Sequence, residues 1–324
     1  MRAAIITRPG GPEVLEIREV ETPEPIGDQV RVRVRAAGIN RADLLQRAGG
    51  YPAPAGSPAH IPGMEFAGEV DAVGPLARLW KPGQRVMGLV GGGAQAEYIV
   101  VHEGLLVEVP ENLDFAQAAG VPEVFMTAHD ALFTQAGLRM GERVLIHAAG
   151  SGVGTAAIQL ARATGATVFG TSRTPAKLEQ ARALGLDFAL SAQDFAAEVQ
   201  RLTSNQGVHV VLDFVGGAYL EQNLQALASW GRMVILATMG GTQGNLNIGL
   251  LMGKRISVKG VTLRTRTLDE KLAVVRAFAT SVLPLLASGK IKPVIERVYP
   301  LEEIGAAHTA MGENRNFGKL ILTL

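Results

Sequence analysis

From residue 143 onward, short apolar runs alternate with stretches of helical periodicity, and this alternation restricts the chain to a small number of folds. Five such runs are present, namely "RVLIHA" (143–148), "TVFGTS" (167–172), "VHVVLDFV" (208–215), "RMVILAT" (232–238) and "ISVKGVTL" (256–263). Parallel strands need long crossover connections, which are usually helices. The pattern therefore predicts an α/β fold whose doubly wound parallel sheet is covered by helices on both faces.

The N-terminal part of the chain has a different period. The run "QVRVRVRAAG" (29–38) alternates apolar and basic residues with a period of two, which is typical of a half-buried strand. Similar short runs, separated by Gly and Pro, occur at 14–21, 66–73, 85–90, 96–101 and 105–110. We therefore expect residues 1 to about 110 to form a β-rich, barrel-like domain.

Helical spacing begins at about residue 113, in a segment with Pro122 and Gly137 as helix breakers. After residue 265, a long helical stretch leads into "PVIERVYP", "LEEIGAAHTAM" and "GKLILTL", which read as strand, helix and strand. This tail either extends the second domain or returns to the first one. Composition alone does not decide between the two.

Charge and composition exclude several classes of protein. The chain has 31 basic and 30 acidic side chains and a formal net charge of +1, so we expect no nucleic-acid partner. An apolar fraction of 47% is that of an ordinary globular enzyme. The absence of cysteine excludes disulfides, thiolate catalysis and Cys-containing zinc sites. The six histidines have no metal-ligand spacing, so we expect no metal.

The sequence also indicates where the protein is found. Gly, Pro and polar residues break the charge-free runs well short of the ~18 apolar residues that a membrane span needs. The start, "MRAAIITRPGG", lacks the apolar core of a signal peptide. We expect a cytoplasmic protein with no membrane association.

The stretch "HAAGSGVGTAAIQLARATG" (147–165) is close to a dinucleotide-binding fingerprint, but Ala149 and Ser151 stand where its first two glycines are expected. A strand, a Gly-rich turn and a helix follow one another here, so free N–H groups and the helix dipole face an anion such as a pyrophosphate. We expect Gly150 and Gly152 to supply unusual backbone angles and Gly154 to allow close packing of helix on strand. The alternative is that any doubly wound fold needs a tight first turn, whatever it binds.

The end of the next strand favours one coenzyme over another. Folds that select NAD carry an Asp or Glu about 20 residues after the glycine turn. This chain has Thr171, Ser172 and Arg173 there, followed by Lys177, with no acid among them. Hydroxyls and cations would receive a 2'-phosphate, so NADPH is favoured over NADH. The alternative is that Arg173 and Lys177 are only solvated residues at a helix start.

Several stretches together carry a family resemblance: "GINRADLLQRAGGYP" (38–52), "IPGMEFAGEV" (61–70), "KPGQRVMGL" (81–89), "GGGAQAEYIVV" (91–101), "AAGSGVGTAAIQLA" (148–161), "LDFVGG" (212–217), "ILATMGG" (235–241) and "NFGKLILTL" (316–324). In their order and spacing, the chain resembles a medium-chain dehydrogenase/reductase, specifically the zinc-free quinone oxidoreductases of the zeta-crystallin type. The resemblance implies a Rossmann-type doubly wound parallel sheet plus a GroES-like β-barrel catalytic domain. It assigns residues 1–122 and 266–324 to the GroES-like domain and 123–265 to the NADPH-binding domain, with substrate in the interdomain cleft.

The resemblance also implies that the metal site is lost. Zinc-dependent alcohol dehydrogenases of the family carry Cys where Asn40 stands, and Gly-His-Glu where this chain has Gly63, Met64 and Glu65. We expect no zinc here. We expect no catalytic role for Asp43 or Glu65.

Site residues follow from the resemblance, position by position. Ser151, Gly152, Val153 and Gly154 would hold the pyrophosphate, and Ser172 and Lys177 the 2'-phosphate, with Thr171 and Arg173 beside them. The ribose and nicotinamide would be lined by Thr127, Val215, Gly216, Leu236, Thr238, Met239, Phe317 and Gly318, and Asn40 and Lys319 complete the coenzyme set. A Tyr that contacts the adenosine phosphate in some relatives is Ala192 here, so Ser191 or Arg173 would replace it.

The catalytic candidates are Asn40 and Tyr51, as polar groups near the nicotinamide face. Asn40 equally suits the cap of the helix "RADLLQRAG", and Tyr51 equally suits a structural ring beside Pro52. The favoured function is NADPH-dependent reduction of quinones by hydride transfer. One alternative is reduction of enoyl thioesters or other activated alkenes with Tyr51 as proton donor. Another is an NADPH-binding crystallin or RNA-binding regulator with little catalysis. By resemblance we also expect a homodimer, formed through the strand at 256–263.

Overall fold

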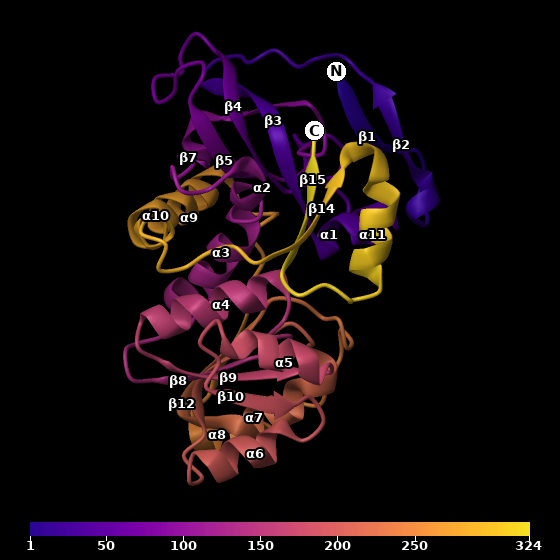
Figure 1. Ribbon diagram of the computed structural model, residues 1–324. Coiled ribbons are helices and arrows are strands. Elements are labelled where there is room, and N and C mark those ends of the chain that lie inside the picture. Colours follow the sequence, from indigo (N-terminus) through magenta and orange to yellow (C-terminus); the bar gives the residue numbers. More distant parts are fainter. The chain divides into compact units, whose positions relative to one another are not determined.

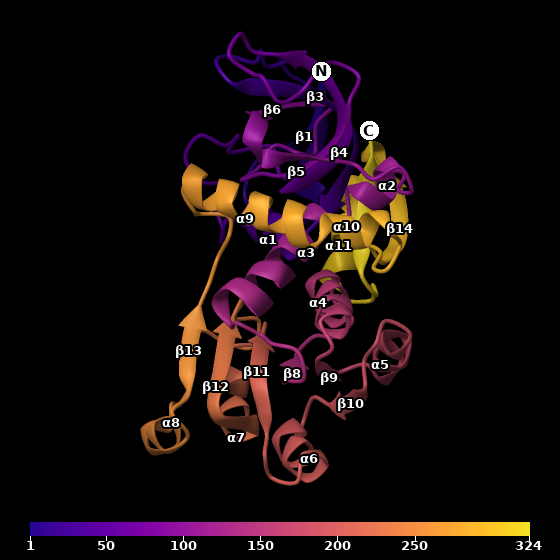
Figure 2. The same ribbon diagram turned by 90° about the vertical axis from the view of Figure 1, so that its left-hand side faces the viewer.

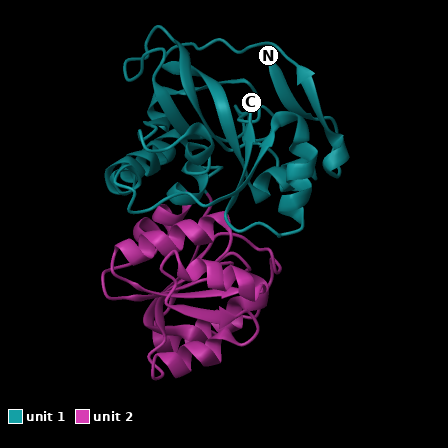
Figure 3. Ribbon diagram, in the orientation of Figure 1, with its two compact units in different colours: residues 1–126, 263–324 teal, residues 127–262 magenta.

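The computed structural model describes residues 1–324, and residues 127–262 form one compact unit, called unit 2, around a six-stranded parallel sheet (Figure 3). The sheet order is β10-β9-β8-β11-β12-β13 (Figure 2). Its strands are β8 (Arg143–Ile146), β9 (Thr167–Ser172), β10 (Phe188–Ser191), β11 (Val208–Asp213), β12 (Leu227–Ile235) and β13 (Ser257–Gly260). Numbered along the chain, this is the order 3-2-1-4-5-6 of a doubly wound dinucleotide fold, which reverses direction between β8 and β11.

Helices cover both faces of this sheet, as the alternating pattern predicts (Figure 1). One face carries α4 (Gly152–Ala163) and α5 (Pro175–Arg182), and the other carries α6 (Phe195–Leu202), α7 (Leu220–Ala226) and α8 (Ile248–Lys254). A 3-10 turn, η4 (Gly217–Tyr219), precedes α7, and a π-helical turn, η3 (Asp130–Gln135), continues α3 (Pro122–His129). In no helix of the protein is the apolar stretch long enough to cross a membrane.

Unit 1 contains residues 1–126 and 263–324 and is built mainly on β-structure. Its seven-stranded sheet has the order β14-β15-β3-β4-β5-β7, with β6 paired to β3, and β1 pairs with β2 separately. The strands are β1 (Arg2–Ile6), β2 (Leu15–Glu19), β3 (Gln29–Ile39), β4 (Glu65–Val73), β5 (Arg85–Leu89), β6 (Tyr98–His102), β7 (Leu106–Glu108), β14 (Ile295–Pro300) and β15 (Lys319–Thr323).

The helices of unit 1 are short except for one near the C-terminal segment. They are α1 (Arg41–Arg47), α2 (Phe115–Ala118), α9 (Leu268–Ser281), α10 (Leu283–Ala287) and α11 (Ile304–Gly312), with 3-10 turns η1 (Pro12–Val14), η2 (Glu103–Leu105) and η5 (Leu301–Glu303). The helix α1 follows β3 directly, so the end of that long strand sets the position of the helix start.

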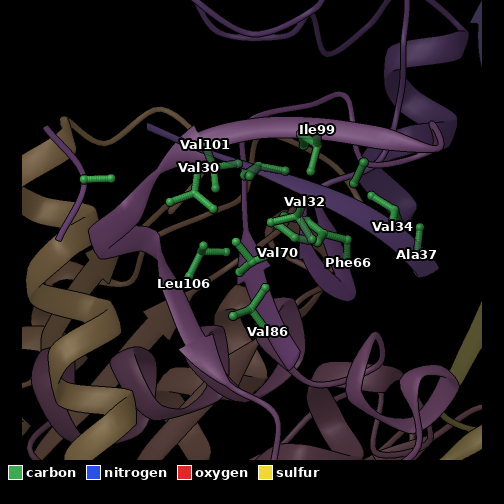
Figure 4. Close-up of a cluster of buried hydrophobic side chains, with 13 residues drawn as sticks. Val30, Val32, Val34, Ala37, Phe66, Val70, Val86, Ile99, Val101 and Leu106 are labelled. Atoms are coloured by element: carbon green, nitrogen blue, oxygen red, sulfur yellow. The ribbon is translucent and has the colours of Figure 1, made fainter. Parts of the chain in front are cut away.

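The core of unit 1 follows from the alternation in β3. Val30, Val32 and Val34 point into a buried cluster with Phe66 of β4 (Figure 4), whereas the arginines between them are partly or fully exposed. Burying a valine side chain contributes about 1.5 kcal/mol or more to stability. Alternation therefore fixes which face of β3 is inside, because a slip of one residue would expose all three valines.

The C-terminal segment belongs to unit 1, which composition had left open. β15 pairs antiparallel with β3, with Leu320 opposite Ile39 and Leu322 opposite Ala37. The compact units divide at residues 126/127 and 262/263, compared with expected boundaries at 122/123 and 265/266. Two strands, β1 and β10, are not among the sequence predictions.

Candidate functional site

The glycine turn of unit 2 connects β8 to α4 and is held by hydrogen bonds at both of its ends. Ser151 is the N-cap of α4, and its Oγ accepts the N–H of Gly154 at 3.0 Å. The N–H of Ala149 donates to the carbonyl of Thr171 at 2.9 Å, which ties the turn to the end of β9. A Cβ at Gly154 would lie 2.4 Å from the carbonyl oxygen of Ala148. Gly154 therefore lets the start of α4 pack closely on the turn that follows β8, next to the strand end where close packing was predicted.

The prediction of unusual backbone angles at Gly150 and Gly152 was wrong. The residue with positive φ in this turn is Ala148, at 47°, and neither glycine is in that region. The reason is the turn itself, because the N–H of Ser151 donates to the carbonyl of Ala148 at 2.8 Å. The chain therefore reverses at its first corner, before the glycines. A non-glycine residue in the left-handed region costs about 1–2 kcal/mol, so the surrounding contacts hold Ala148 in strain.

The end of β9 presents the residues expected at the 2'-phosphate. Ser172 is partly exposed and its Oγ accepts the N–H of Thr174 at 3.1 Å, while Arg173 is exposed. Lys177 lies one turn into α5 and is partly buried. Thr171 differs, because it is 1% exposed and its hydroxyl bonds to the ring of His147 instead of facing solvent.

His147 forms a buried polar network that the sequence reasoning missed. Its Nδ1 lies 2.8 Å from Thr171 Oγ1 and its Nε2 lies 2.6 Å from Asn223 Oδ1. The amide oxygen of Asn223 only accepts, so Nε2 carries the proton and the Thr171 hydroxyl donates to Nδ1. Burial lowers the pKa of His147 to about 4, so the ring is neutral near pH 7. The network fixes the ends of β8 and β9 to α7, and nothing in the local sequence indicates partners 24 and 76 residues away.

The ends of β11 and β12 bring the remaining unit 2 candidates together. The Asp213 carboxylate accepts the N–H of Val215 at 2.7 Å and that of Gly216 at 3.1 Å, and Gly216 has a φ of 79°. The N–H of Met239 donates to the carbonyl of Phe214 at 3.2 Å. Val215, Gly216, Leu236, Thr238 and Met239 thus lie on two adjoining loops at the carboxyl edge of the sheet. This is the edge at which doubly wound folds bind ligands.

In unit 1, Asn40, Glu65 and Lys319 form a buried cluster, called the Lys319 cluster below. The Lys319 ammonium lies 2.6 Å from Glu65 Oε1, and it donates to Asn40 Oδ1 and to the carbonyl of Ile39, each at 2.7 Å. Asn40 Nδ2 donates to Glu65 Oε1 at 3.0 Å, and the N–H of Glu123 donates to Glu65 Oε2 at 2.8 Å. Both atoms of the Asn40 amide and all three ammonium donors therefore have protein partners.

Asp43 is a second buried carboxyl group close to this cluster, in the first turn of α1. It accepts the N–H of Asn40, the residue at the N-cap position, at 2.8 Å and that of Gly63 at 3.0 Å. Burial raises the pKa of Asp43 to about 6, although these N–H bonds and the nearby cations Lys319 and Arg264 oppose the shift.

Tyr51 lies in the loop after α1 and is partly buried. Its hydroxyl has no hydrogen-bond partner in the protein, while its carbonyl accepts from Arg264 at 3.1 Å. The Arg264 guanidinium lies over the Tyr51 ring at 4.9 Å from the centroid. The sequence gives no signal for Arg264, which stands in an ordinary polar stretch.

The expected site residues fall into two sets, one in each compact unit. Unit 2 holds Thr127 of α3, the glycine turn, the end of β9 and the loops after β11 and β12. Unit 1 holds Asn40, Tyr51, Phe317, Gly318 and Lys319. Gly318 has a φ of 84°, and a Cβ there would lie 2.3 Å from the carbonyl of Val294.

Comparison with known proteins adds to this geometry. The family described as "Alcohol dehydrogenase GroES-like domain" matches residues 27–111, and the one described as "Zinc-binding dehydrogenase" matches residues 152–280. The human quinone oxidoreductase is 32% identical over all of this chain and 98% of its own length. The quinone oxidoreductase of Pseudomonas aeruginosa is 38% identical over 97% of this chain and 96% of its own.

Solved structures agree with these matches over the whole chain. A structure named as an NAD-dependent alcohol dehydrogenase has a TM-score of 0.90 and 35% identity, with full coverage of both chains. A quinone oxidoreductase of Pseudomonas syringae has a TM-score of 0.88 and 33% identity, covering all of this chain and 99% of its own. The CurK enoyl reductase has a TM-score of 0.88 and 29% identity, covering 99% and 98%.

The fold, the glycine turn and these matches define an oxidoreductase that uses a nicotinamide coenzyme. The chain belongs to the medium-chain dehydrogenase/reductase family, in its branch of quinone oxidoreductases related to zeta-crystallin. The site suits such a coenzyme, because the first N–H groups of α4, at Gly152 and Val153, have no partner within the helix.

Zinc, which one family description mentions, does not fit the corresponding residues. By the family resemblance, Asn40, Met64 and Glu65 correspond to positions at which zinc-dependent relatives carry ligands. The only carboxylate among them is in contact with the Lys319 ammonium, which also occupies the Asn40 oxygen. A divalent cation there would meet a resident positive charge at close range and a thioether, which is a poor zinc ligand.

Proposed function

We propose that the protein reduces quinones with NADPH as the electron donor. The observation that carries the coenzyme choice is the end of β9, where Ser172, Arg173 and the following Lys177 present a hydroxyl and two cations, with no acidic residue. A carboxylate there would repel a 2'-phosphate, whereas these groups would bind it through charge-assisted bonds. The choice of a quinone as acceptor rests on the relatives named above.

In this proposal the residues of unit 2 bind and orient the coenzyme. The start of α4, from Ser151 to Gly154, receives the pyrophosphate through backbone N–H groups and the helix dipole. In unit 2 the ribose and nicotinamide would be held by Thr127, Val215, Gly216, Leu236, Thr238 and Met239. In unit 1 the resemblance proposes Phe317 and Gly318 for the same part of the coenzyme. The bound dihydronicotinamide supplies the hydride. The protein contributes mainly orientation, because a quinone accepts hydride without a strong acid.

Asn40 and Tyr51 are proposed as the polar groups of unit 1 that face the acceptor. The hydroxyl of Tyr51 has no partner in the protein and is therefore available to donate to an acceptor oxygen. The Asn40 amide is held by Glu65 and Lys319, so the Lys319 cluster fixes its orientation. The Lys319 ammonium already contacts Ile39, Asn40 and Glu65. It would have to leave these partners before it could bind a coenzyme phosphate.

Substitution of Lys177 tests the coenzyme proposal. Loss of a charge-assisted bond costs about 1.5–3 kcal/mol, so Lys177→Ala is expected to weaken NADPH binding at least tenfold and NADH binding less than twofold. Arg182→Ala is the matched control, because Arg182 lies in the same helix and pairs with Glu179. Isothermal titration calorimetry of both coenzymes measures the effect. Unchanged NADPH affinity in Lys177→Ala would place the 2'-phosphate elsewhere.

A second candidate is reduction of activated alkenes, for which Tyr51 would be the proton donor. It is favoured by the unpartnered Tyr51 hydroxyl and by the likeness to an enoyl reductase. Steady-state turnover with 1,4-benzoquinone and with crotonyl-CoA separates the two candidates. A strong preference for the thioester, lost in Tyr51→Phe, would replace quinone reduction as the proposed function. Tight NADPH binding without oxidation by any acceptor would point to a coenzyme-binding protein with little catalysis.

A homodimer is proposed through β13. This strand is the edge of the unit 2 sheet, all four of its residues are exposed, and it pairs only with β12. An open edge can add a strand from a second copy, and a twofold axis makes that contact symmetric. Sedimentation velocity on the native chain is expected to give twice the chain mass of 34.1 kDa. A single species at the mass of one chain would contradict the dimer. A cytoplasmic location remains a prediction from the sequence.

A further inference from the structure

Arg264 is a buried cation that unit 1 holds almost entirely through uncharged groups. It is 4% exposed, and its Nε donates to the carbonyl of Gly91 at 2.8 Å. One terminal nitrogen donates to the carbonyl of Tyr51 at 3.1 Å and the other to the side-chain oxygen of Gln46. No salt bridge is formed with Arg264. Asp43 is the acidic group whose charge acts on it.

Burying a cation among uncharged groups lowers stability unless its hydrogen-bond donors all find well-placed acceptors. Taking a guanidinium out of water is unfavourable, and here three oxygen acceptors and one aromatic face together offset that cost. The planar fork of Arg provides this geometry, whereas Lys has a single ammonium and cannot reach three acceptors in one plane. The contacts therefore identify a position that needs arginine and not merely positive charge.

The groups that Arg264 joins come from three separate segments. Gln46 lies in α1, and its Nε2 donates to the carbonyl of Ala59 at 3.0 Å. Tyr51 begins the loop that ends near Ala59. Gly91 packs against the middle of that loop, because a Cβ at Gly91 would lie 2.4 Å from Ser57 Oγ. Arg264 thus holds both the start of the 51–59 loop and the glycine turn that supports it.

Arg264 contacts Tyr51 at two places, its backbone carbonyl and its ring. The backbone carbonyl is fixed by a hydrogen bond and the ring face by the guanidinium at 4.9 Å from its centroid. The first contact holds the backbone at Tyr51 and the second packs against the ring, so together they restrict where the side chain places its hydroxyl. The hydroxyl itself remains without a protein partner.

We propose that Arg264 is a positioning residue for Tyr51: it holds the phenol where its hydroxyl donates to the acceptor oxygen. This proposal rests on the proposed function, in which Tyr51 faces the acceptor. Misplacement of a donor by about 1 Å can cost up to a hundredfold in rate, so loosening the Tyr51 loop is expected to lower catalysis without removing any group that touches the acceptor.

The test is a double-mutant cycle of Arg264→Lys with Tyr51→Phe. In the native background, Arg264→Lys is expected to lower kcat/KM for the acceptor about tenfold, with the KM for NADPH unchanged. In the Tyr51→Phe background, the same substitution is expected to change kcat/KM less than twofold, because the group that Arg264 positions is already missing. Equal losses in both backgrounds would overturn the proposal.

Arg85→Lys is the matched control. Arg85 lies over the Phe115 ring at 4.8 Å from its centroid and donates to the carbonyl of Leu113, so it makes the same kinds of contact elsewhere in unit 1. This variant is expected to leave kcat/KM within twofold of the native value. A tenfold loss in Arg85→Lys as well would show that general loosening of unit 1 explains the effect, and would overturn the proposal.

Hydrogen–deuterium exchange gives a readout that needs no turnover. In Arg264→Lys, peptides covering residues 48–60 and 89–95 are expected to exchange at least fivefold faster, with the other peptides of unit 1 unchanged. Faster exchange throughout unit 1, or no change in either segment, would overturn the proposal. If Arg264→Lys does not fold, Gln46→Ala removes one acceptor and leaves the cation, and only the 89–95 segment is compared, because Gln46 also bonds directly to Ala59.

The two readouts separate this proposal from the proposed function. Absence of turnover by the native protein with every acceptor would refute the proposed function. Localised exchange in Arg264→Lys would then still support the holding of Tyr51 by Arg264, whereas unchanged exchange would refute that as well.

Discussion

Removing the Lys319 ammonium tests the buried cluster at the end of β3. Lys319→Met keeps most of the volume of the side chain and deletes the charge. In the native protein the side chains of Lys319 and Glu65 are 3% and 0% exposed, so water does not screen the pair. The variant leaves the Glu65 carboxylate buried with only the N–H groups of Asn40 and Glu123. Breaking a buried pair on one side costs about 3–5 kcal/mol, which is the expected loss in free energy of unfolding.

The double variant Glu65→Gln/Lys319→Met decides whether this loss comes from an unpaired charge. Each single variant leaves one buried ion without its partner, whereas the double variant leaves neither. We therefore expect the double variant to lose about 2–3 kcal/mol less free energy of unfolding than the sum of the two single losses. Arg18→Met is the control, because Arg18 pairs with Glu16 at the surface with both side chains more than half exposed, and its loss should stay below about 1 kcal/mol.

Urea denaturation followed by tryptophan fluorescence measures these free energies. Trp80 packs on the core of unit 1 and donates to the carbonyl of Glu103 at 2.9 Å, whereas Trp230 belongs to unit 2 and is 65% exposed. A Trp230→Phe background therefore makes the signal specific to unit 1. A loss below about 1 kcal/mol in Lys319→Met, or strict additivity in the double variant, would refute the reasoning.

Three further predictions concern single positions. Gly154→Ala places a Cβ 2.4 Å from the Ala148 carbonyl, so we expect coenzyme affinity to fall at least tenfold in calorimetry, and an unchanged affinity would contradict the role of the turn. Burial raises the pKa of Asp43 from 3.8 to about 6, so its contribution to stability is fully present below pH 4 and is lost as the pH rises through 6, a change of about 3 kcal/mol. Asp43→Asn should lack this part of the pH dependence in urea titrations between pH 4 and 8, and an identical profile would count against it. Thr171→Val leaves the buried His147 Nδ1 without its donor and should lower the free energy of unfolding of unit 2 by about 1–3 kcal/mol, with recovery in Thr171→Ser.

The sequence predicted those strands and turns that can be recognised from a short stretch of neighbouring residues. Five of the six strands of unit 2 have apolar runs bounded by turns, and β3 alternates with a period of two over residues 29–35, so these strands could be placed without knowledge of the rest of the chain. Gly154 could also be assigned, because the close approach of a helix to the preceding strand is a property of that one turn. The strands β1 and β10 were missed because buried and partly exposed residues do not alternate in β1, and only Leu190 is buried in β10, so neither carries a strand pattern.

The contacts that build the site depend on residues far apart in the chain, and no periodicity records them. Lys319 reaches Asn40 across 279 residues, and Arg264 reaches Tyr51 across 213. The position of the strained residue in the glycine turn was also missed. Sequence reasoning assigns left-handed angles to glycine, but the hydrogen bond that closes this turn imposes them on Ala148.

The path of the chain through the two units has a consequence for biosynthesis. Unit 2 is one continuous segment, whereas the sheet of unit 1 is completed only when β15, which ends at Thr323, pairs with β3. The chain segment of β3 is made about 280 residues before β15, so its residues 36–39 lack their partner strand while the intervening chain, including unit 2, is synthesised. Nascent chains that stall before the final strand would therefore expose unpaired backbone groups at this edge. Such an edge promotes aggregation, and we expect chaperones to bind the chain at this stage.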